Sequence, residues 1–444
     1  MSAPANEQET KGEASVLRVA ILGSGPSGSA LACLLARRGA EVTLFEHGRR
    51  PELVVGESLV PAVIPMLRRL GIEEEIAAIG LLKPGASFVW SPTDRFSFTF
   101  ARFAPVVPPY AYNVPRPRFD EILLANAIAS GTQVVRIRAR VERASRNTDT
   151  ELKLTAETLA AASHWRGRQP DLIVDATGRS RLVARMLDIP TRIGPRDDLA
   201  HFAHFEGFRW EEAPGQVVIS RLKAGWSWCI PLRDKLSIGI VVGRRDAHRL
   251  GATPEERLRN AIALEPALTA LAGEARRVTP VATYSNYQLI SQRGYGPGWV
   301  MAGDALGFVD PMLSPGVSLA LLSAELLAEA LTPLIRRRSP VELGSVLARY
   351  TAVQMNNINA WSKLVAYFYD GRMAAMQRAG REWVEAGSNF LKVAAHDHIE
   401  RQVALQASGV GVTSRYSSGL LRFMGRYGLR GVVPADLAIQ RAGE

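Results

Sequence analysis

Short apolar runs alternate with amphipathic stretches in the first part of the chain. Leu17 to Leu22 predicts a buried strand, Ser29 to Arg38 predicts a helix, and Glu41 to Phe45 predicts a second strand. A strand, a helix and a strand in this order are typical of a parallel sheet that is covered by helices. We therefore expect an α/β unit at this end of the chain.

Further along, apolar and polar positions alternate with a period of two. Val134 to Leu154 and Arg209 to Gly243 both show this pattern, which predicts antiparallel strands. The second stretch contains Trp226 and Trp228, whose alternate positions place both indoles on one face of a strand. Because large aromatic side chains are costly to expose, the two indoles belong either to a core strand or to the wall of a dry tunnel.

Beyond Leu331 the pattern is helical, and its aromatic positions predict mostly core residues. A run of arginines without acids, interleaved with apolar residues, lies close to the C-terminus: Arg415, Arg422, Arg426 and Arg430. This run predicts an amphipathic helix that docks on the body of the protein. The alternative is a docking surface for an acidic partner, such as a carrier protein or a peptide that bears the substrate.

Length and composition place the chain among globular enzymes. Its 444 residues suffice for two or three structural units, and a hydrophobic share of 47% is ordinary. Residues 1–15 are polar and lack the apolar run of a secretory signal, so we expect a disordered tail there. The most apolar helix, Leu319 to Leu331, is interrupted by Glu325 and Glu329, which argues against a membrane span. Two cysteines give no disulfide framework and favour a cytoplasmic protein.

The formal charge of +11 raises the question of nucleic-acid binding. No zinc-finger, RNA-recognition or helix-turn-helix pattern accompanies the arginines, so we expect no nucleic-acid partner. The positive charge instead suits an anionic cofactor or an acidic partner. His396 and His398 flank Asp397 without further ligands, and we therefore expect no metal site.

The first predicted strand runs into a glycine-rich turn at residues 23–28 (GSGPSG) and then into the predicted helix. In such a turn the first glycine allows a tight bend, the second lets the backbone approach a pyrophosphate, and the third lets helix and strand pack closely. The helix N-terminus offers N–H groups to the phosphates. Glu46 ends the second strand, where its carboxylate can accept both ribose hydroxyls. The residues expected to bind the dinucleotide here are Gly23, Gly25, Pro26, Ser27, Gly28 and Glu46.

Two later segments resemble FAD-dependent monooxygenases rather than NAD dehydrogenases. Residues 171–179 (DLIVDATGR) resemble the strand and turn that return to the nucleotide in those enzymes. Residues 299–305 (WVMAGDA) resemble the segment whose aspartate meets the flavin ribityl chain, which assigns Gly303 and Asp304 to the cofactor. FAD is therefore the expected cofactor.

Residues 114–120 (VPRPRFD) are similar to a further element of that superfamily, in which an arginine approaches the cofactor. The resemblance gives this role to Arg116, whose backbone is stiffened by a proline on each side. The alternative is a solvated arginine at the start of a helix over Phe119 to Ala129.

Further segments resemble the flavin-dependent halogenases. Residues 225–231 (GWSWCIP) resemble their W-x-W-x-I-P signature, which lies between flavin and substrate. Residues 56–61 (GESLVP) resemble the turn after their second strand. Residues 82–90 (LKPGASFVW) are similar to a halogenase stretch whose lysine, here Lys83, delivers the halogen to an aromatic carbon. A surface lysine before a Pro-Gly turn is the alternative. The whole resemblance covers residues 17–331.

The sequence departs from this pattern at one loop. Residues 310–317 (DPMLSPGV) match the halogenase loop in which halide rests on backbone N–H groups, but Pro315 has no amide hydrogen to offer. Leu313 also stands where tryptophan halogenases carry a glutamate. Proline suits the first turn of a helix over Gly316 to Leu331, whose positive end would face the flavin through Gly316 and Val317. This departure favours oxygen insertion over halide chemistry.

The expected enzyme is an FAD-dependent monooxygenase that hydroxylates an electron-rich aromatic ring, a phenol or an indole, free or bound to a carrier protein or peptide. Thr177 replaces an acid that helps single-component hydroxylases to accommodate NAD(P)H, so the resemblance implies reduced FAD from a separate reductase. A halogenase of the phenol or pyrrole type is the first alternative. A flavin-dependent isoprenoid double-bond reductase is the second, and a non-catalytic flavoprotein that binds a partner is the third.

The expected architecture is the aromatic-hydroxylase fold, in the α/β class. A Rossmann-like FAD-binding domain takes residues 16–200 and 280–340, with substrate-side segments inserted at 80–115. An antiparallel substrate-domain sheet takes residues 201–279, and a helical C-terminal region takes residues 341–444.

Overall fold

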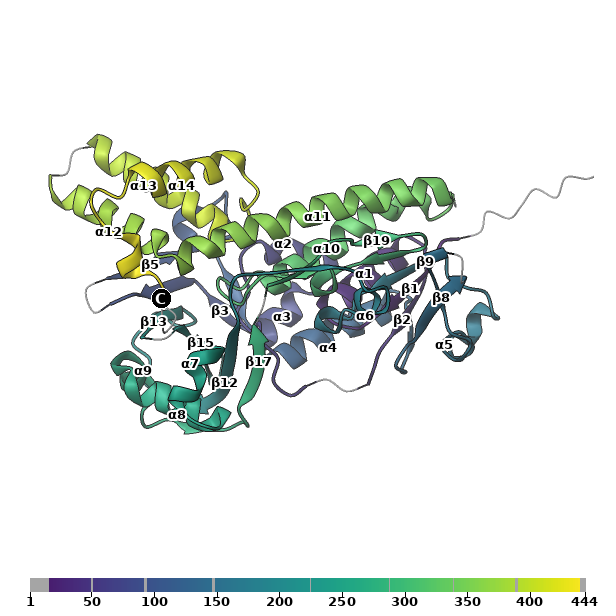
Figure 1. The fold of residues 1–444 in the computed structure, drawn as a ribbon, viewed down its shortest axis with the longest axis horizontal. Coiled ribbons are helices and arrows are strands. Elements are labelled where there is room, and N and C mark those ends of the chain that lie inside the picture. The colour runs from purple at the N-terminus through teal and green to yellow at the C-terminus, as the bar shows by residue number, and fades with distance from the viewer. Residues whose placement is uncertain are drawn as a thin grey trace, which may run out of the picture.

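The computed structural model describes residues 16–439, apart from 49–50, 92–93, 146–147, 224, 287, 338 and 388–389. The expected disordered tail over residues 1–15 lies outside the described residues. Figure 1 shows a first sheet around β1 and β2, a second sheet around β12 and β15, and a group of C-terminal helices. The long helix α11 (Pro340–Tyr369) extends from the side of the first sheet towards these C-terminal helices.

Six strands form the first sheet, in the order β19-β20-β10-β1-β2-β7. Their bounds in that order are Tyr295–Gly296, Trp299–Met301, Leu172–Asp175, Arg18–Leu22, Glu41–Phe45 and Gln133–Val135. The strands pair in parallel, except that β19 runs antiparallel to β20 at the edge. Every residue of β1 is buried, as in a central strand with both faces covered. The two strands predicted at the N-terminus are thus confirmed.

The helices α1 (Pro26–Arg37), α4 (Arg116–Ala129) and α10 (Pro315–Leu331) each begin earlier than the sequence pattern predicted. Each has a proline within its first two positions. There the proline ring fixes φ near the helical value, and its missing N–H removes no intrahelical hydrogen bond. In α1 and α4 a proline that the pattern placed before the helix therefore lies in its first turn, whereas Pro315 lies in the first turn of α10 as the sequence indicated.

Among the described residues, one helical segment, Pro315–Leu334, is long and apolar enough to cross a membrane by length and composition alone. It contains α10, which packs against α1 and α11. Most of the segment is buried inside the protein. Its apolar character therefore matches that of a core helix in a globular domain.

The second sheet has eight strands, in the order β16-β12-β15-β14-β13-β4-β5, with β17 beside β12. The bounds are Arg276–Arg277, Asp198–Glu206, Leu236–Gly243, Gly225–Pro231, Val217–Leu222, Gly85–Val89, Arg95–Thr99 and Ala282–Asn286. All neighbours are antiparallel except β4 and β13, which pair in parallel. The sheet thus extends beyond the expected range 201–279, because strand alternation predicts a strand but not its partners.

The alternation of residues 134–154 predicted antiparallel strands, which is confirmed for β8 (Val141–Ser145) and β9 (Thr148–Leu154) but wrong for β7, because β7 pairs in parallel with β2. The first part of this stretch thus lies in the first sheet, and β8 and β9 form a separate hairpin. Two small sheets complete the strands, formed by β11 (Thr191–Ile193), β18 (Leu289–Ser291) and β21 (Gly307–Phe308), and by β3 (Leu81–Lys83) and β6 (Ala111–Asn113).

The two faces of the second sheet contact different parts of the protein. One face packs through residues such as Ala203 and Ile240 on α7 (Arg244–Leu250), α8 (Pro254–Leu264) and α9 (Pro266–Ala272). The other face, which carries Phe202, Trp226 and Trp228, belongs to the core shared with α11. This arrangement makes both faces apolar and leaves the indole face pointing towards the first sheet.

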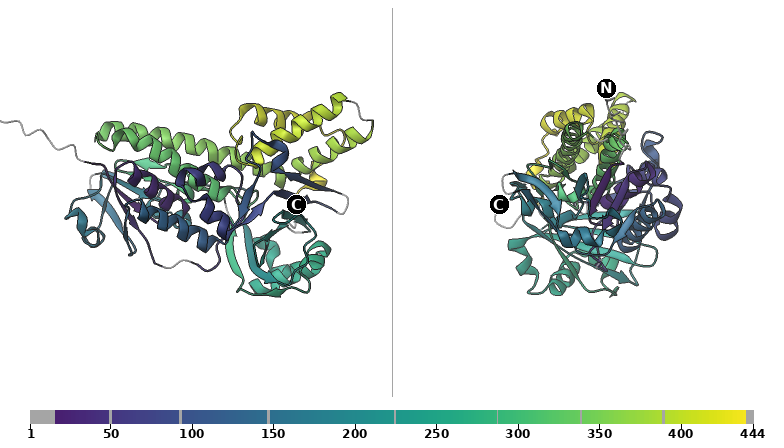
Figure 2. Two further views of the ribbon diagram at one scale, coloured as in Figure 1. Left: turned by 180° about the vertical axis from the view of Figure 1, so that it is seen from behind. Right: turned by 90° about the vertical axis from the view of Figure 1, so that its right-hand side faces the viewer.

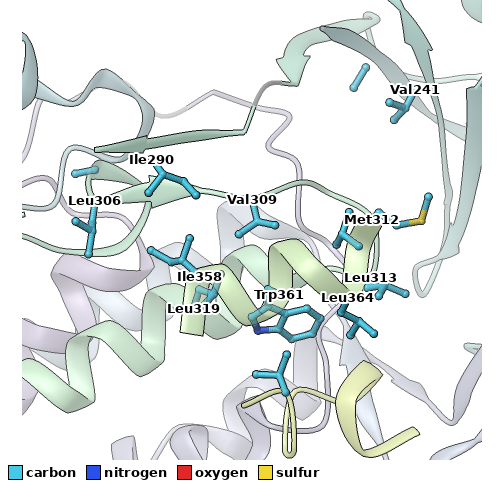
Figure 3. Packing of buried hydrophobic residues seen from close by; sticks show 14 of the residues in the cluster. Val241, Ile290, Leu306, Val309, Met312, Leu313, Leu319, Ile358, Trp361 and Leu364 are labelled. Atoms are coloured by element: carbon cyan, nitrogen blue, oxygen red, sulfur yellow. The ribbon is translucent and has the colours of Figure 1, made fainter. Parts of the chain in front are cut away.

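The remaining helices lie around these layers (Figure 2). They are α2 (Val63–Leu70), α3 (Glu73–Ile79), α5 (Ala156–Ala161), α6 (Leu182–Met186), α12 (Arg372–Glu385), α13 (Phe390–Ala407) and α14 (Arg415–Tyr427). Figure 3 shows how α11 supports the start of α10: Trp361 and Leu364 lie beneath Met312 and Leu313 of the loop before that helix. This loop is therefore part of the core.

Candidate active site

One cavity joins the glycine-rich turn of the first sheet to the indole face of the second. Residues from the first side include Gly25, Pro26, Ser27, Arg116, Asp304 and Val317. Residues from the second side include Ala200, Val217, Ile219, Trp226, Trp228 and Ile230. A group bound at the turn would thus extend to an apolar, indole-bordered wall.

The glycine-rich turn has the close packing that the sequence predicted. A Cβ at residue 28 would lie 1.9 Å from the carbonyl oxygen of Gly23, so only glycine fits there. No described side chain caps the start of α1 at Gly25. The Ser27 hydroxyl is buried without a hydrogen-bond partner among the described residues and faces the cavity. Free N–H groups and a buried hydroxyl fit the pyrophosphate of a dinucleotide.

Glu46 directly follows β2 and lies beside this turn. The Ser24 hydroxyl donates to its Oε1 at 3.2 Å, and Arg136 Nε lies 3.3 Å from its Oε2. The carboxylate is buried, and it is not among the residues that line the cavity. Its role in holding ribose hydroxyls stays a prediction.

Asp304 lies in the one-turn helix η4 (Gly303–Ala305) after β20, and it lines the cavity. Burial raises the pKa of this carboxyl to about 6. The backbone N–H of Gly303 donates to the Ser323 hydroxyl at 2.9 Å, which fixes the turn against α10. A half-buried carboxylate that lines the cavity fits the hydroxyl-rich ribityl chain of FAD.

Arg116 is buried, which excludes the solvated alternative. Its Nη1 donates to the carbonyl oxygen of Val55 at 2.6 Å, and its Nη2 pairs with Asp120 at 3.1 Å. Because Val55 precedes the G-E-S-L turn, the guanidinium attaches that turn to α4. Arg116 also lines the cavity, where its charge suits a phosphate or a ribose hydroxyl.

Lys83 ends β3 and is only 5% exposed, which excludes a surface lysine. Its Nζ donates to Ser58 Oγ at 2.8 Å and to the Leu59 carbonyl oxygen at 2.9 Å. Burial lowers the pKa of the Lys83 ammonium to about 7. Ser58 lines the cavity, whereas Lys83 does not. The amine therefore lies directly behind Ser58 rather than on the open wall.

Trp226 and Trp228 lie on β14, and their ring centroids are 5.8 Å apart. Both are buried and both line the cavity, so the core and tunnel-wall interpretations describe the same residues. Trp228 Nε1 donates to Ser237 Oγ at 3.3 Å. A Cβ at Gly239 would lie 2.1 Å from the Trp228 ring, so this glycine allows the indole to lie flat on the sheet.

The loop before α10 takes an unusual conformation. Leu313 and Ser314 both have positive φ, of 66° and 57°, which is strained for residues other than glycine. Pro315 then starts α10, and no described side chain caps the helix. Gly316 and Val317 line the cavity. They lie in the first turn of α10, where backbone N–H groups have no acceptor within the helix. The positive end of α10 therefore faces the cavity, and its place beside the flavin stays a prediction.

Several contributors to the site were missed in the sequence. Arg179 lines the cavity, with its guanidinium 5.3 Å from the ring centroids of both Tyr284 and Phe308. Glu57, inside the G-E-S-L turn, pairs with His204 of β12 at 2.7 Å. The alternation recognised in the sequence covered residues 209–243 and not β12, so no local signal indicated that His204 lies against Glu57.

On α14, Leu421 is buried, whereas Arg415, Arg422 and Arg426 are exposed. The helix packs on α12 and α13 through Ser417 and Leu421, whereas its aromatic residues Tyr416, Phe423 and Tyr427 are exposed. A docking role for the arginines stays a prediction. The sites around His396 and His398 contain no described group of three or more metal-ligating side chains.

The comparisons agree with this geometry. A family model described as FAD binding domain matches residues 16–356. The chain is 30% identical to a tryptophan 2-halogenase of Chondromyces crocatus, over 80% of this chain and 68% of that protein. It is 27% identical to the 1H-pyrrole-2-carbonyl-(peptidyl-carrier protein) chlorinase of Pseudomonas fluorescens, over 79% and 83%.

Solved structures show the same likeness. The crystal structure of CmlS, a flavin-dependent halogenase, matches with a TM-score of 0.68 at 27% identity, over 80% of this chain and 64% of that chain. The glycine-rich turn, Asp304 and the α10 N-terminus form one cavity that fits FAD. The chain is therefore an FAD-dependent enzyme that belongs to the superfamily of flavin-dependent halogenases and FAD-dependent aromatic monooxygenases.

Proposed function

We propose that this enzyme halogenates an electron-rich aromatic ring, using reduced FAD, O2 and chloride or bromide. The observation that carries the proposal is Lys83, a buried amine whose pKa is lowered to about 7 and which lies behind Ser58 at the cavity. An amine with this pKa is partly neutral at pH 7 and can act as a nucleophile towards an electrophilic halogen. The names of the halogenase relatives support halogenation as the reaction.

Bound FAD would supply the electrons that activate O2. The chain's own residues hold and order the reactants. Arg116, Asp304 and the α10 N-terminus hold the cofactor side, and the two indoles exclude water from the passage to the ring. Ser58 and the Leu59 carbonyl oxygen orient the Lys83 amine.

The substrate class follows from the relatives and the cavity wall. One relative is named for tryptophan and another for a pyrrole carried by a peptidyl-carrier protein. An apolar wall with two indoles suits a flat ring of this kind, a phenol, pyrrole or indole.

We further propose that a separate reductase supplies reduced FAD. A carrier or peptide could then dock at the exposed arginines of α14.

Hydroxylation of such a ring is the second candidate, and Pro315 favours it. At the start of α10 this residue offers no N–H, so a halide there would lose one donor. The remaining N–H groups of Gly316 and Val317 still face the cavity. The relatives support halogenation more than hydroxylation, and they give no support to the isoprenoid double-bond reductase.

The two buried cysteines, with no disulfide between them, support a cytoplasmic location as a proposal.

The test is a product assay on the full chain with FAD. A flavin reductase, NADH and O2 are supplied with a panel of phenols, indoles and pyrroles, with bromide, with chloride and without halide. We expect halogenated product by mass spectrometry, and its loss in Lys83→Met. Hydroxylated product that forms equally well without halide would instead support the second candidate. Turnover that does not depend on O2 would exclude both.

A further inference from the structure

The cavity-facing side of the second sheet is apolar except at a few positions. Residues that pair directly across neighbouring strands point to the same face of a sheet. His204 of β12 pairs with Ser237 of β15, and Ser237 pairs with Ile230 of β14. Phe202 and Trp228 lie on the same face, with ring centroids 5.7 Å apart. His204 therefore stands on the sheet face that forms the indole wall.

His204 has a buried acidic partner. Its Nε2 lies 2.7 Å from Oε1 of Glu57, and the two residues are 9% and 3% exposed. The described residues give the second oxygen of Glu57, Oε2, no hydrogen-bond partner, and Glu57 lines the cavity. A buried carboxylate held by one partner and facing a cavity is a frequent arrangement for proton transfer.

The pair lies next to the amine that carries the proposed function. Ser58 follows Glu57 in the chain and accepts the hydrogen bond from Lys83 Nζ. Two other carboxylates line the cavity among the described residues. Asp310 accepts hydrogen bonds from Met312 N at 2.8 Å and from Tyr369 Oη at 3.1 Å. Asp304 lies on the cofactor side. Glu57 is thus the cavity carboxylate that is bonded to the histidine of the indole face and that precedes, in the chain, the serine holding the amine.

We infer that Glu57 is the base that takes the proton from the substituted ring, and that His204 is the residue that positions it. This inference rests on the proposed function. When the ring carbon forms its bond to the electrophilic halogen, the C–H bond must break. Its electron pair returns to the ring, and its proton passes to Glu57. The same proton must leave if oxygen is the electrophile, so the assignment holds for hydroxylation too.

The role of Glu57 is tested with Glu57→Gln in the FAD-loaded enzyme, using substrate with deuterium or hydrogen at the reacting carbon. We expect product formation to fall about 100-fold, the range for loss of a general base. A primary isotope effect, absent in the wild type, should appear because proton removal becomes limiting. FAD affinity and the rate of flavin reoxidation should stay unchanged. Glu57→Asp, which keeps the charge, should recover part of the rate.

The role of His204 is tested with His204→Gln, which should raise the same isotope effect with a smaller loss of rate. His201→Gln is the matched control, because His201 lies on the opposite face of β12 and its Nδ1 is 2.9 Å from Thr283 Oγ1. It should leave the isotope effect unchanged.

The outcomes separate this inference from the proposed function. A wild type that forms neither halogenated nor hydroxylated product defeats the proposed function. If the wild type is active, three results for Glu57→Gln and Glu57→Asp would overturn the inference alone. These are full turnover, loss of FAD, and slower turnover without an isotope effect.

Discussion

The indole Nε1 of Trp226 donates a hydrogen bond of 2.9 Å to Oη of Tyr369. Tyr369 ends α11, so this bond attaches the long helix to the cavity wall. The same hydroxyl donates to Asp310 in the loop before α10, at 3.1 Å. Burial raises the pKa of Tyr369 well above its usual value, so the phenol stays neutral and can both donate and accept. One hydroxyl thus joins the sheet, the loop and the helix.

Tyr369→Phe removes both of these bonds and leaves the Trp226 N–H buried without a partner. We expect the free energy of unfolding to fall by about 1–3 kcal/mol, the cost of an unsatisfied buried polar group. Thermal and denaturant unfolding would measure the change. Tyr367→Phe is the matched control, because no described hydrogen bond uses the hydroxyl of Tyr367. The ring of Tyr367 stacks under the Arg372 guanidinium, with Cζ 3.8 Å from the ring centroid, and phenylalanine keeps this contact. An equal loss in both variants would contradict the role of the Trp226 bond.

The glycines of the first turn should separate folding from cofactor binding. In Gly28→Ala the new Cβ would meet the Gly23 carbonyl oxygen at 1.9 Å, so the turn must shift and the protein should lose stability by about 1–3 kcal/mol or more. In Gly25→Ala nothing lies within 4 Å of the new Cβ, and the FAD-free protein should stay stable. If residue 25 meets the pyrophosphate, this variant should still bind FAD more weakly. Fluorescence titration with FAD and thermal unfolding would measure both effects.

The sequence predicted what is local in the structure. The first two strands, the turn at Gly23 to Gly28 and the helix start at Pro315 depend on neighbouring residues, and all were recognisable. The contacts that were missed join distant segments. Glu57 and His204 are 147 positions apart, and Trp226 and Tyr369 are 143 apart.

Strand partners were missed for the same reason. The alternation around residues 134–154 predicted strands correctly, but it could not show that β7 pairs with β2 and that β8 pairs with β9. Likewise, nothing local places β4 beside β13. Lys83 was recognised by resemblance, yet its position behind Ser58 depends on the packing of β3 against the G-E-S-L turn.

Asp304→Asn should separate the stability of the apoprotein from the affinity for FAD. Burial raises the pKa of Asp304 from 3.8 to about 6, so the folded state binds the proton more tightly than the unfolded state. The apoprotein should therefore lose stability as pH rises from about 4 to about 6, by an amount on the order of 3 kcal/mol. Asparagine should remove this loss at pH 7 while weakening FAD binding. Unchanged FAD affinity would contradict the assignment of Asp304 to the ribityl chain.

Lys83 should set the pH dependence of turnover. Burial lowers its pKa from 10.5 to about 7, so the unfolded state binds more protons between these values and stability should rise with pH across that window. If the neutral amine captures the halogen, product formation should rise with pH through a midpoint near pH 7. Lys83→Met should lose product and keep flavin reoxidation. Lys153→Met, which removes an ion pair with Glu142 at 3.3 Å on the β8–β9 hairpin, should leave the profile unchanged.

Pro315→Ser tests why the loop before α10 departs from the halogenase pattern. Serine restores one N–H at the first position of α10, beside the N–H groups of Gly316 and Val317. A hydrogen bond to a charged group contributes about 1.5–3 kcal/mol, so the KM for halide should fall about 10- to 100-fold if halide binds there. Pro340→Ser at the first turn of α11 is the control for the loss of a helix-starting proline, and it should change stability alone. An unchanged KM for halide in Pro315→Ser, together with a halide-independent hydroxylated product, would show that this loop serves oxygen chemistry instead.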